Sequence, residues 1–332
     1  MKKSFLVAIL IVLTFTSCAQ RVGIKALEPA EVDRISQTKK ITVTYFDNDR
    51  VGLSDKVEAK LAGFQLDNKK YFTIVSRKDF DNIISEQKLQ NSGLVDPKDA
   101  VKIGNIIGAQ AIISGHVSSP SIQDSRFYEQ RVRCANSKCT ELSYYNVSCM
   151  KRVSSLSADI RVIDVTKGDV IYADTLTRSS TDKHCIDDSR VLPSREMAGQ
   201  YLANAIADSF TYKLTPHYKQ FDVALLEKPD IDYTDRDEQL LKVSLTYIEQ
   251  GRYDKAEKLL MDLVDATAQK SYVPFYNLGV IKEAQGNYDE AKEYYGYADN
   301  LMIEPVEEIN NAVVRIESLI EKRKRTMEQI NR

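Results

Sequence analysis

Near its end the chain repeats itself. The run Gly251-Arg252-Tyr253-Asp254-Lys255-Ala256 returns 35 residues later as Gly286-Asn287-Tyr288-Asp289-Glu290-Ala291. A period of about 34 residues is typical of stacked pairs of antiparallel helices, in which small residues let the helices approach and large residues fill the space between them. The last third of the chain is therefore predicted to be an all-α array.

The second copy resembles the tetratricopeptide repeat. Its small and large positions hold Phe275, Leu278, Gly279, Gly286, Tyr288, Ala291, Tyr295 and Ala298. Ile309, Val313, Ile316 and Ile320 then mark one more amphipathic helix, which we interpret as a solvating cap. We predict two repeats and a capping helix over residues 236–332. Two repeats are fewer than such arrays usually need for stability. The array must therefore be stabilised by contacts with its cap, with the rest of the chain or with another subunit.

Arrays of this kind bind a peptide or a helix on their concave side, which the first helix of each repeat lines. The predicted partner-binding residues on that side are Lys242, Thr246, Asn277 and Lys282. The alternative is that the array is a spacer or a docking surface, because the residues of the motif are structural.

The start of the chain has the pattern of an export signal. Lys2 and Lys3 precede an apolar run from Phe5 to Phe15, which is too short to span a bilayer and ends in Thr16-Ser17-Cys18. We predict a signal peptide over residues 1–17, acyl chains such as palmitate on Cys18, and a tether over residues 18–37. An ordinary secretory signal cut nearby is the alternative. Ala19 and Gln20 carry no acidic sorting signal, which favours the outer membrane with the protein facing the periplasm.

Four further cysteines, Cys134, Cys139, Cys149 and Cys185, are an even number in a compartment that permits disulfides. Four thiols allow three pairings. We favour Cys134 with Cys139 across a short turn, which leaves Cys149 with Cys185. The alternative is a zinc site that includes His184, although the spacings fit no common zinc pattern.

Residues 38–215 are predicted to form an α/β domain. Strands are expected over residues 41–46, 72–75 and 110–117, with helices over 53–64, 78–90 and 101–107. Residues 118–155 are polar and are predicted to be loop-like, with a hairpin at the first cysteine pair. A second hairpin is expected over residues 156–177, then a helix over residues 194–213 and a proline-bearing linker over residues 216–235.

Several stretches of this domain resemble the CsgG-type curli-assembly lipoprotein family. They are Ile74–Phe80, Ile84–Gln87, Ser92–Pro97, Ala100–Gly104, Gly108–Gly115 and Ile160–Val165 with Gly168. The resemblance implies a mixed sheet flanked by helices, an α/β domain that activator lipoproteins of penicillin-binding proteins share. The resemblance also implies a role in assembly at the cell envelope.

The family includes secretion channels, which need two membrane hairpins in each subunit. The segments in those places, around residues 129–152 and 179–193, are rich in charged residues, whereas a lipid-facing strand needs about 9–11 residues with every second one apolar. We therefore predict a member of the fold that forms no pore, and keep a channel subunit as the alternative.

Little in the sequence favours catalysis. His116, His184 and His217 lie apart and in no metal or nucleophile motif, and no glycine loop of a phosphate site is present. The formal net charge of −2, with both signs interspersed, lacks the basic footprint of a nucleic-acid binder. We expect a non-catalytic scaffold or regulator without cofactor or metal, with envelope proteins as partners and with homo-oligomerisation left open.

Overall fold

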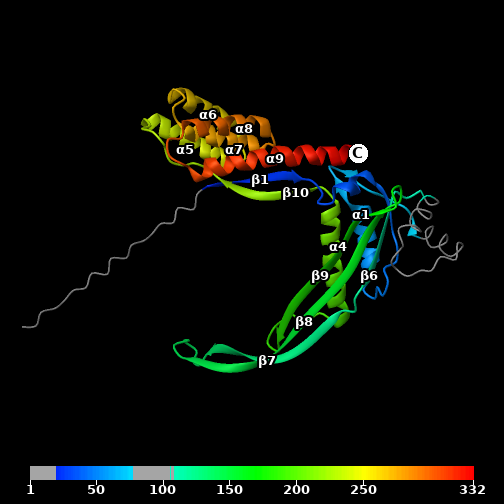
Figure 1. Ribbon diagram of the computed structural model, residues 1–332. Coiled ribbons are helices and arrows are strands. Elements are labelled where there is room, and N and C mark those ends of the chain that lie inside the picture. Colours follow the sequence, from blue (N-terminus) through cyan, green and yellow to red (C-terminus); the bar gives the residue numbers. More distant parts are fainter. Residues whose placement is uncertain (1–19, 78–104, 106–107) are drawn as a thin grey trace, which may run out of the picture. The chain divides into compact units, whose positions relative to one another are not determined.

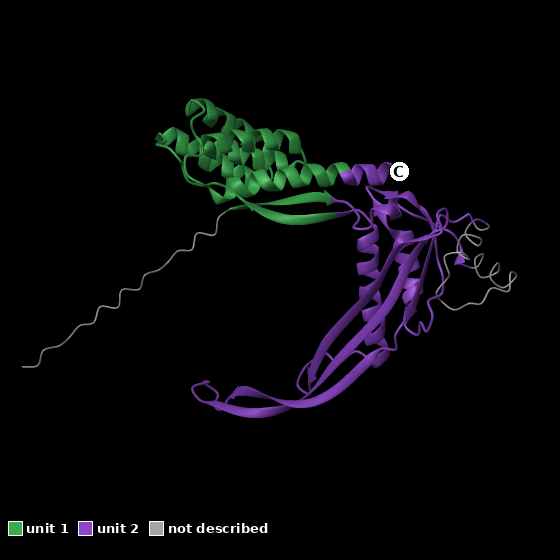
Figure 2. Ribbon diagram, in the orientation of Figure 1, with its two compact units in different colours: residues 1–27, 218–324 green, residues 28–217, 325–332 purple. Residues whose placement is uncertain are grey.

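The computed structural model describes residues 20–77, residue 105 and residues 108–332. These residues form two compact units, shown in different colours in Figure 2. Unit 1 contains the N-terminal residues up to Leu27 together with Tyr218–Lys324, and unit 2 contains Glu28–His217 together with Arg325–Arg332. Within the described residues, no helix is both long and apolar enough to cross a membrane.

Unit 2 is built on a sheet in which β6 (Ala111–Val117) is central. β6 pairs in parallel with β2 (Lys40–Val43) and antiparallel with β8 (Leu142–Asp164), and β2 also pairs in parallel with β5 (Thr73–Ile74). Ala111, Ile112 and Ile113 are fully buried, as a strand covered on both faces requires. The dense apolar run of β6 thus confirms the central strand, and both parallel and antiparallel pairs make the predicted mixed sheet.

Two helices cover one face of this sheet. Leu53, Val57 and Leu61 of α1 (Leu53–Gly63) share a buried cluster with Leu202, Ile206 and Phe210 of α4 (Arg195–Leu214) and with the inward residues of β2, β6 and β8. Asp49 fixes the start of α1, because its carboxylate accepts the backbone N–H groups of Leu53 and Ser54 at 2.9 and 2.8 Å. The helices predicted over residues 78–90 and 101–107 lie almost wholly outside the described residues.

The prediction of a loop-like segment over residues 118–155 is wrong, whereas the hairpin predicted at the first cysteine pair is confirmed. These residues form β7 (Ser121–Cys134) and the first part of β8, paired antiparallel from Ser121 with Ser155 to Cys134 with Leu142. Beyond this hairpin β8 pairs with β9 (Asp169–Cys185), and the long curved strands are visible in Figure 1. Most side chains of β7 are exposed on both faces, so the backbone ladder holds the strand and its sequence lacks the apolar alternation that marks a half-buried strand.

A strand stands where the tether was predicted. β1 (Arg21–Glu28) pairs with β10 (His217–Ala224), which lies within the predicted linker. Val22, Ile24 and Ala26 of β1 are buried in the core of unit 1 together with Val223 and Leu225. The short 3-10 helix η1 (Asp33–Gln37), assigned to unit 2, ends the stretch. Residues 21–37 are therefore folded, and the β1–β10 ribbon belongs to the helical unit.

The helices of unit 1 confirm the repeat pattern. α5 (Asp235–Glu249) with α6 (Tyr253–Ala266) and α7 (Tyr272–Ala284) with α8 (Tyr288–Leu301) are the two helical pairs, and α9 (Glu307–Asn331) follows as the predicted cap. Gly251 and Gly286 have φ values of 70° and 78° in the turn inside each pair, a left-handed conformation that glycine adopts without strain. The repeated glycine of the motif therefore marks these turns.

α9 ends in unit 2, which contains the chain from Arg325 onward. The side-chain amide of Gln329 is fully buried, accepts the backbone N–H of Ala30 at 2.8 Å and donates to the carbonyl of Ala30 at 3.2 Å. Lys39 donates to the carbonyl of Gln329 at 3.0 Å, and Arg332 forms an ion pair with Asp33 at 2.9 Å. Burial is the main reason why the pKa of Lys39 is lowered to about 8. The last residues of the chain therefore complete unit 2.

Candidate functional site

A hollow of about 840 Å³ opens on unit 1 along α5. We call it the α5 groove. The segment before α5 and the first described residue of the chain complete its walls. Its lining residues are Gln20, Glu227, Pro229, Asp235, Glu238, Gln239, Leu241, Lys242, Leu245 and Thr246.

The start of α5 is fixed by a capping box. The Thr234 hydroxyl accepts the backbone N–H of Asp237 at 3.3 Å, and the Asp237 carboxylate accepts the backbone N–H of Thr234 at 3.1 Å. Leu241 and Leu245 then face the core and form the floor of the groove. Lys242 and Thr246 are exposed and lie four residues apart, on one face of the helix. The structure therefore places two of the four predicted partner-binding residues side by side at an open hollow.

The groove carries more acidic than basic side chains. Glu227, Asp235 and Glu238 line it, against the single cation of Lys242. Within the described residues, none of these four side chains belongs to an ion pair. Glu227 accepts the backbone N–H of Gln20. Asp235, Glu238 and Lys242 are exposed and can pair with charges of a partner, which would set orientation and association rate. The α5 groove thus combines an apolar floor with a polar rim, the usual anatomy of a protein contact.

Asn277 was predicted to display its side chain to a partner, and this is wrong. The side chain is fully buried: its oxygen accepts the backbone N–H of Leu226 at 3.0 Å and its amide nitrogen donates to the carbonyl of Leu226 at 2.8 Å. The hydroxyl of the neighbouring Tyr276 donates to the carbonyl of Ala224 at 2.8 Å. The chain's own segment after β10 therefore occupies the inner side of α7, where a bound peptide was expected.

The prediction for Lys282 is also wrong. Its side chain is 11% exposed and forms ion pairs with Glu257 of α6 at 2.8 Å and Glu290 of α8 at 2.9 Å. Burial opposes the charged form of Lys282, but the hydrogen bonds that its ammonium donates to the two carboxylates prevail and raise the pKa of Lys282. Lys282 joins helices of the array and does not face the groove.

A second buried network holds α7, α8 and α9 together. Arg315 donates two hydrogen bonds to the fully buried carboxylate of Glu283, at 2.7 and 2.9 Å, and the hydroxyl of Tyr295 donates to the same carboxylate at 2.5 Å. Burial, followed by the charge of Glu283, raises the pKa of Tyr295 well above its usual value. Every charge of this network is paired inside the core, which is the structural use of a buried ion pair.

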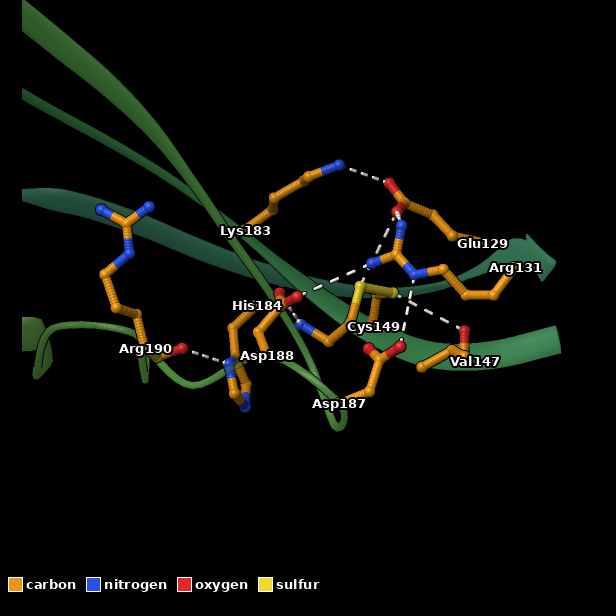
Figure 3. The surroundings of a disulfide bond; sticks show 10 residues. Glu129, Arg131, Val147, Cys149, Lys183, His184, Asp187, Asp188 and Arg190 are labelled. Carbon is orange, nitrogen blue, oxygen red and sulfur yellow. Dashed lines mark hydrogen bonds and ion pairs between the residues drawn. A yellow bond between two sulfur atoms is a disulfide. The ribbon is translucent and has the colours of Figure 1, made fainter. Parts of the chain in front are cut away.

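The disulfides lie in unit 2. Cys134 is joined to Cys139 and Cys149 to Cys185, the pairing favoured from the sequence. Cys149 and Cys185 are directly opposite each other on β8 and β9, and Figure 3 shows their surroundings. Because their sulfurs are bonded to each other, neither is a free thiolate for a metal. His184, the extra ligand of the zinc alternative, instead places Nδ1 2.5 Å from the carbonyl of Arg190.

Charged side chains surround the second disulfide. Arg131 forms ion pairs with Glu129 at 2.9 Å, Asp187 at 3.3 Å and Asp188 at 3.6 Å, and Lys183 reaches Glu129 at 2.6 Å (Figure 3). The hydrogen bond to Asp187 is the main reason why the pKa of Arg131 is raised. These side chains are partly exposed and mutually neutralised, so they fix the end of β9 more than they offer a site.

Sequence reasoning missed the residues of the α5 groove outside the repeats. Gln20 and Glu227 reach it because the pairing of β1 with β10 brings the start of β1 beside the segment that follows β10, and no local pattern links positions so far apart in the chain. Asp235 and Glu238 could have been predicted to lie at a helix start, because Thr234 with Asp237 is a recognisable capping pair. The predicted lipid-attachment residue, Cys18, lies outside the described residues.

The two units have the features of known protein families. Residues 31–189 match the family model described as "Curli production assembly/transport component CsgG", and residues 274–297 match the model of a tetratricopeptide repeat. The chain thus carries a CsgG-family domain followed by tetratricopeptide-like repeats. Together these domains indicate a protein-interaction role in the cell envelope.

Among solved structures, the crystal structure of lipoprotein GNA1162 from Neisseria meningitidis is 15% identical to this chain. The match covers 52% of this chain and 97% of that one, with a TM-score of 0.25. No curated protein matches the chain.

Proposed function

We propose that the protein is a lipoprotein anchored through Cys18 to the outer membrane, facing the periplasm. There it acts without catalysis as a scaffold or regulator in the assembly of an envelope or secretion machine. The α5 groove is the contact site for a protein partner. One observation carries this proposal: an open hollow in the repeat unit, with an apolar floor and with unpaired charges at its rim, belongs to a chain that also carries a CsgG-family domain.

Crosslinking from single positions tests the groove. A photoreactive amino acid at Thr246 or at Gln239 lies in the α5 groove, and one at Lys258, exposed on α6, lies outside it. We expect both groove positions to capture the same envelope protein in cells and Lys258 to capture none of it. Equal capture from Lys258, or no adduct from either groove position, would contradict the proposal.

Point changes are better suited to this test than removal of the repeats. Val22, Ile24 and Val223 of the β1–β10 ribbon are buried against the helices of unit 1. A chain cut before α5 would keep the ribbon and expose these apolar side chains. Loss of binding in such a truncated protein would therefore have two explanations.

A channel subunit remains the second candidate, and the lengths of three strands favour it. β7, β8 and β9 have 14, 23 and 17 residues, whereas a membrane-spanning strand needs about 9–11. Tyr128, Val132, Leu142 and Tyr144 of the β7–β8 hairpin are exposed. Purification in detergent separates the two candidates: a ring of subunits with single-channel conductance supports the channel, and a monodisperse protein that needs no detergent once Cys18 is replaced by serine supports the scaffold.

A further inference from the structure

We propose that the anchor holds the repeat unit itself against the membrane, with the end of unit 1 that carries Gln20 lying at the lipid headgroups. This inference rests on the lipidation of Cys18 proposed above. It differs from the arrangement expected of a tethered lipoprotein, in which a flexible segment lets the folded part move away from the bilayer.

Hydrogen bonds of its backbone and of its side-chain amide nitrogen fix Gln20 to unit 1. Its backbone N–H donates to the carboxylate of Glu227, and its carbonyl accepts the backbone N–H of Leu225 at 2.8 Å. Its side-chain amide donates to the carboxylate of Glu249, at the end of α5, at 2.9 Å. Three partners on two segments therefore hold Gln20 to unit 1.

The strand that follows secures the attachment. Val22, Ile24 and Ala26 alternate into the core of unit 1 and are at most 5% exposed, and β10 pairs with β1. A pull on the chain at Gln20 therefore acts on a paired strand with a buried apolar side. A force on the lipid anchor is therefore transmitted directly to unit 1.

The chain between anchor and fold is very short. Only Ala19 separates Cys18 from Gln20. Two steps along the chain span at most about 7 Å, which is close to the thickness of one headgroup layer. A flexible segment of 20 residues would instead have a root-mean-square length of about 25 Å. Gln20, and the α5 groove that it lines, must therefore stay near the membrane surface.

Charge attraction does not explain such a position. The charged side chains around Gln20 are of both signs: Glu227, Glu249, Asp235 and Glu238 against Lys242 and the exposed Arg21 and Lys228. They form no basic patch that would attract anionic lipids, so the short anchor holds the surface in place. The partner of the α5 groove is then a segment that approaches the membrane surface.

The experiment uses the absence of tryptophan from the chain. Gln239→Trp puts one fluorophore at an exposed position of the α5 groove. The full-length lipidated protein is placed in phosphatidylcholine vesicles that carry headgroup spin-labelled lipid, which quenches tryptophan at short range. The matched control inserts a 24-residue Gly/Ser linker between Ala19 and Gln20, with a root-mean-square length of about 27 Å. Mass spectrometry of each protein reports whether Cys18 carries its lipid.

We expect the labelled lipid to reduce the emission at least twofold in the protein with its native spacing, and the linker to restore at least half of that loss. Full emission from a lipidated protein with native spacing would overturn the inference and leave the anchor intact. Equal quenching with and without the linker would also overturn it, since unit 1 would then bind lipid by itself. A mass without lipid on Cys18 would refute the anchor, and the inference with it.

Discussion

Replacing Gly279 by alanine tests how closely α7 and α8 pack. A Cβ at this position would lie 2.5 Å from both Cδ1 and Cε1 of Tyr295, far inside van der Waals contact. The ring has little room to withdraw, because Tyr295 is fully buried and its hydroxyl donates to Glu283, which Arg315 holds with two hydrogen bonds. The substitution must therefore separate the helices or move the ring out of its network.

Two effects oppose each other in this variant. Alanine is the better helix former and would raise the free energy of unfolding by about 1 kcal/mol. Inserting a methyl group into a filled core lowers it by about 1–3 kcal/mol, and an overlap with a fixed ring belongs at the upper end. We expect Gly279→Ala to lower the free energy of unfolding by about 1–2 kcal/mol.

Gly296→Ala in α8 is the matched control, because a Cβ there meets no atom within 4 Å. Only the helix preference then acts, and we expect stabilisation by about 0.5–1 kcal/mol. Urea unfolding followed by circular dichroism at the helix band compares the two variants with the unchanged protein. If Gly279→Ala proves as stable as the unchanged protein or more so, the close contact with Tyr295 is refuted.

Three further predictions concern unit 2. Cys149→Ser should lower the free energy of unfolding by up to about 4 kcal/mol and Cys134→Ser by up to about 2 kcal/mol, because the two bridges close loops with sequence separations of 36 and 5. Unfolding experiments without reductant measure both losses. Equal losses would contradict the dependence on loop length. Removal of residues 325–332, which hold Ala30 and Lys39, should speed limited proteolysis of the CsgG-like domain, and an unchanged rate would count against that contact. Hydrogen bonds from Arg152 are the main reason why the pKa of Asp124 is lowered to about 2 from 3.8. Asp124→Asn should therefore lower the free energy of unfolding above about pH 4, and the difference from the unchanged protein should vanish as the pH falls to about 2. Acid titrations of both proteins measure this difference.

The sequence predicted the helical array well because its signal is local. Gly251 and Gly286 mark turns with positive φ, and Gly279 with Tyr295 marks a contact between neighbouring helices. Such contacts join residues close together in the chain, so each repeat shows its packing within about 34 residues. The buried run of β6 was readable for a similar reason, since burial on both faces leaves a continuous apolar stretch.

β1 was missed although its alternation is visible in the sequence. Val22, Ile24 and Ala26 are apolar, and Arg21, Gly23 and Lys25 between them are exposed. Eight residues that follow a predicted lipid anchor suggest a tether, and the partner strand β10 begins only at His217. A strand whose partner is so distant gives no hairpin signal, so its pairing shows only in the fold.

β7 was not predicted from the sequence for a different reason. Its exposed side chains give no apolar face, and the strand is extended because its backbone pairs with β8 along 14 positions. Charged residues such as Glu129 and Arg131 read as loop residues in the sequence. In the structure they are partners of each other and of the end of β9.

Asn277 shows why the array needs more than its own repeats. Two repeats leave the inner face of α7 uncovered, and a buried amide there must find hydrogen-bond partners or destabilise the fold. The segment after β10 supplies them through the backbone of Leu226, and the ribbon adds Val22, Ile24 and Val223 to the same core. The backbone of the chain itself thus covers part of the surface that a longer array would offer to a ligand. What stays open is the stretch along α5, where Lys242 and Thr246 line the same groove as Gln20. Under the two proposals above, the partner and the membrane would meet the repeat unit at this same end.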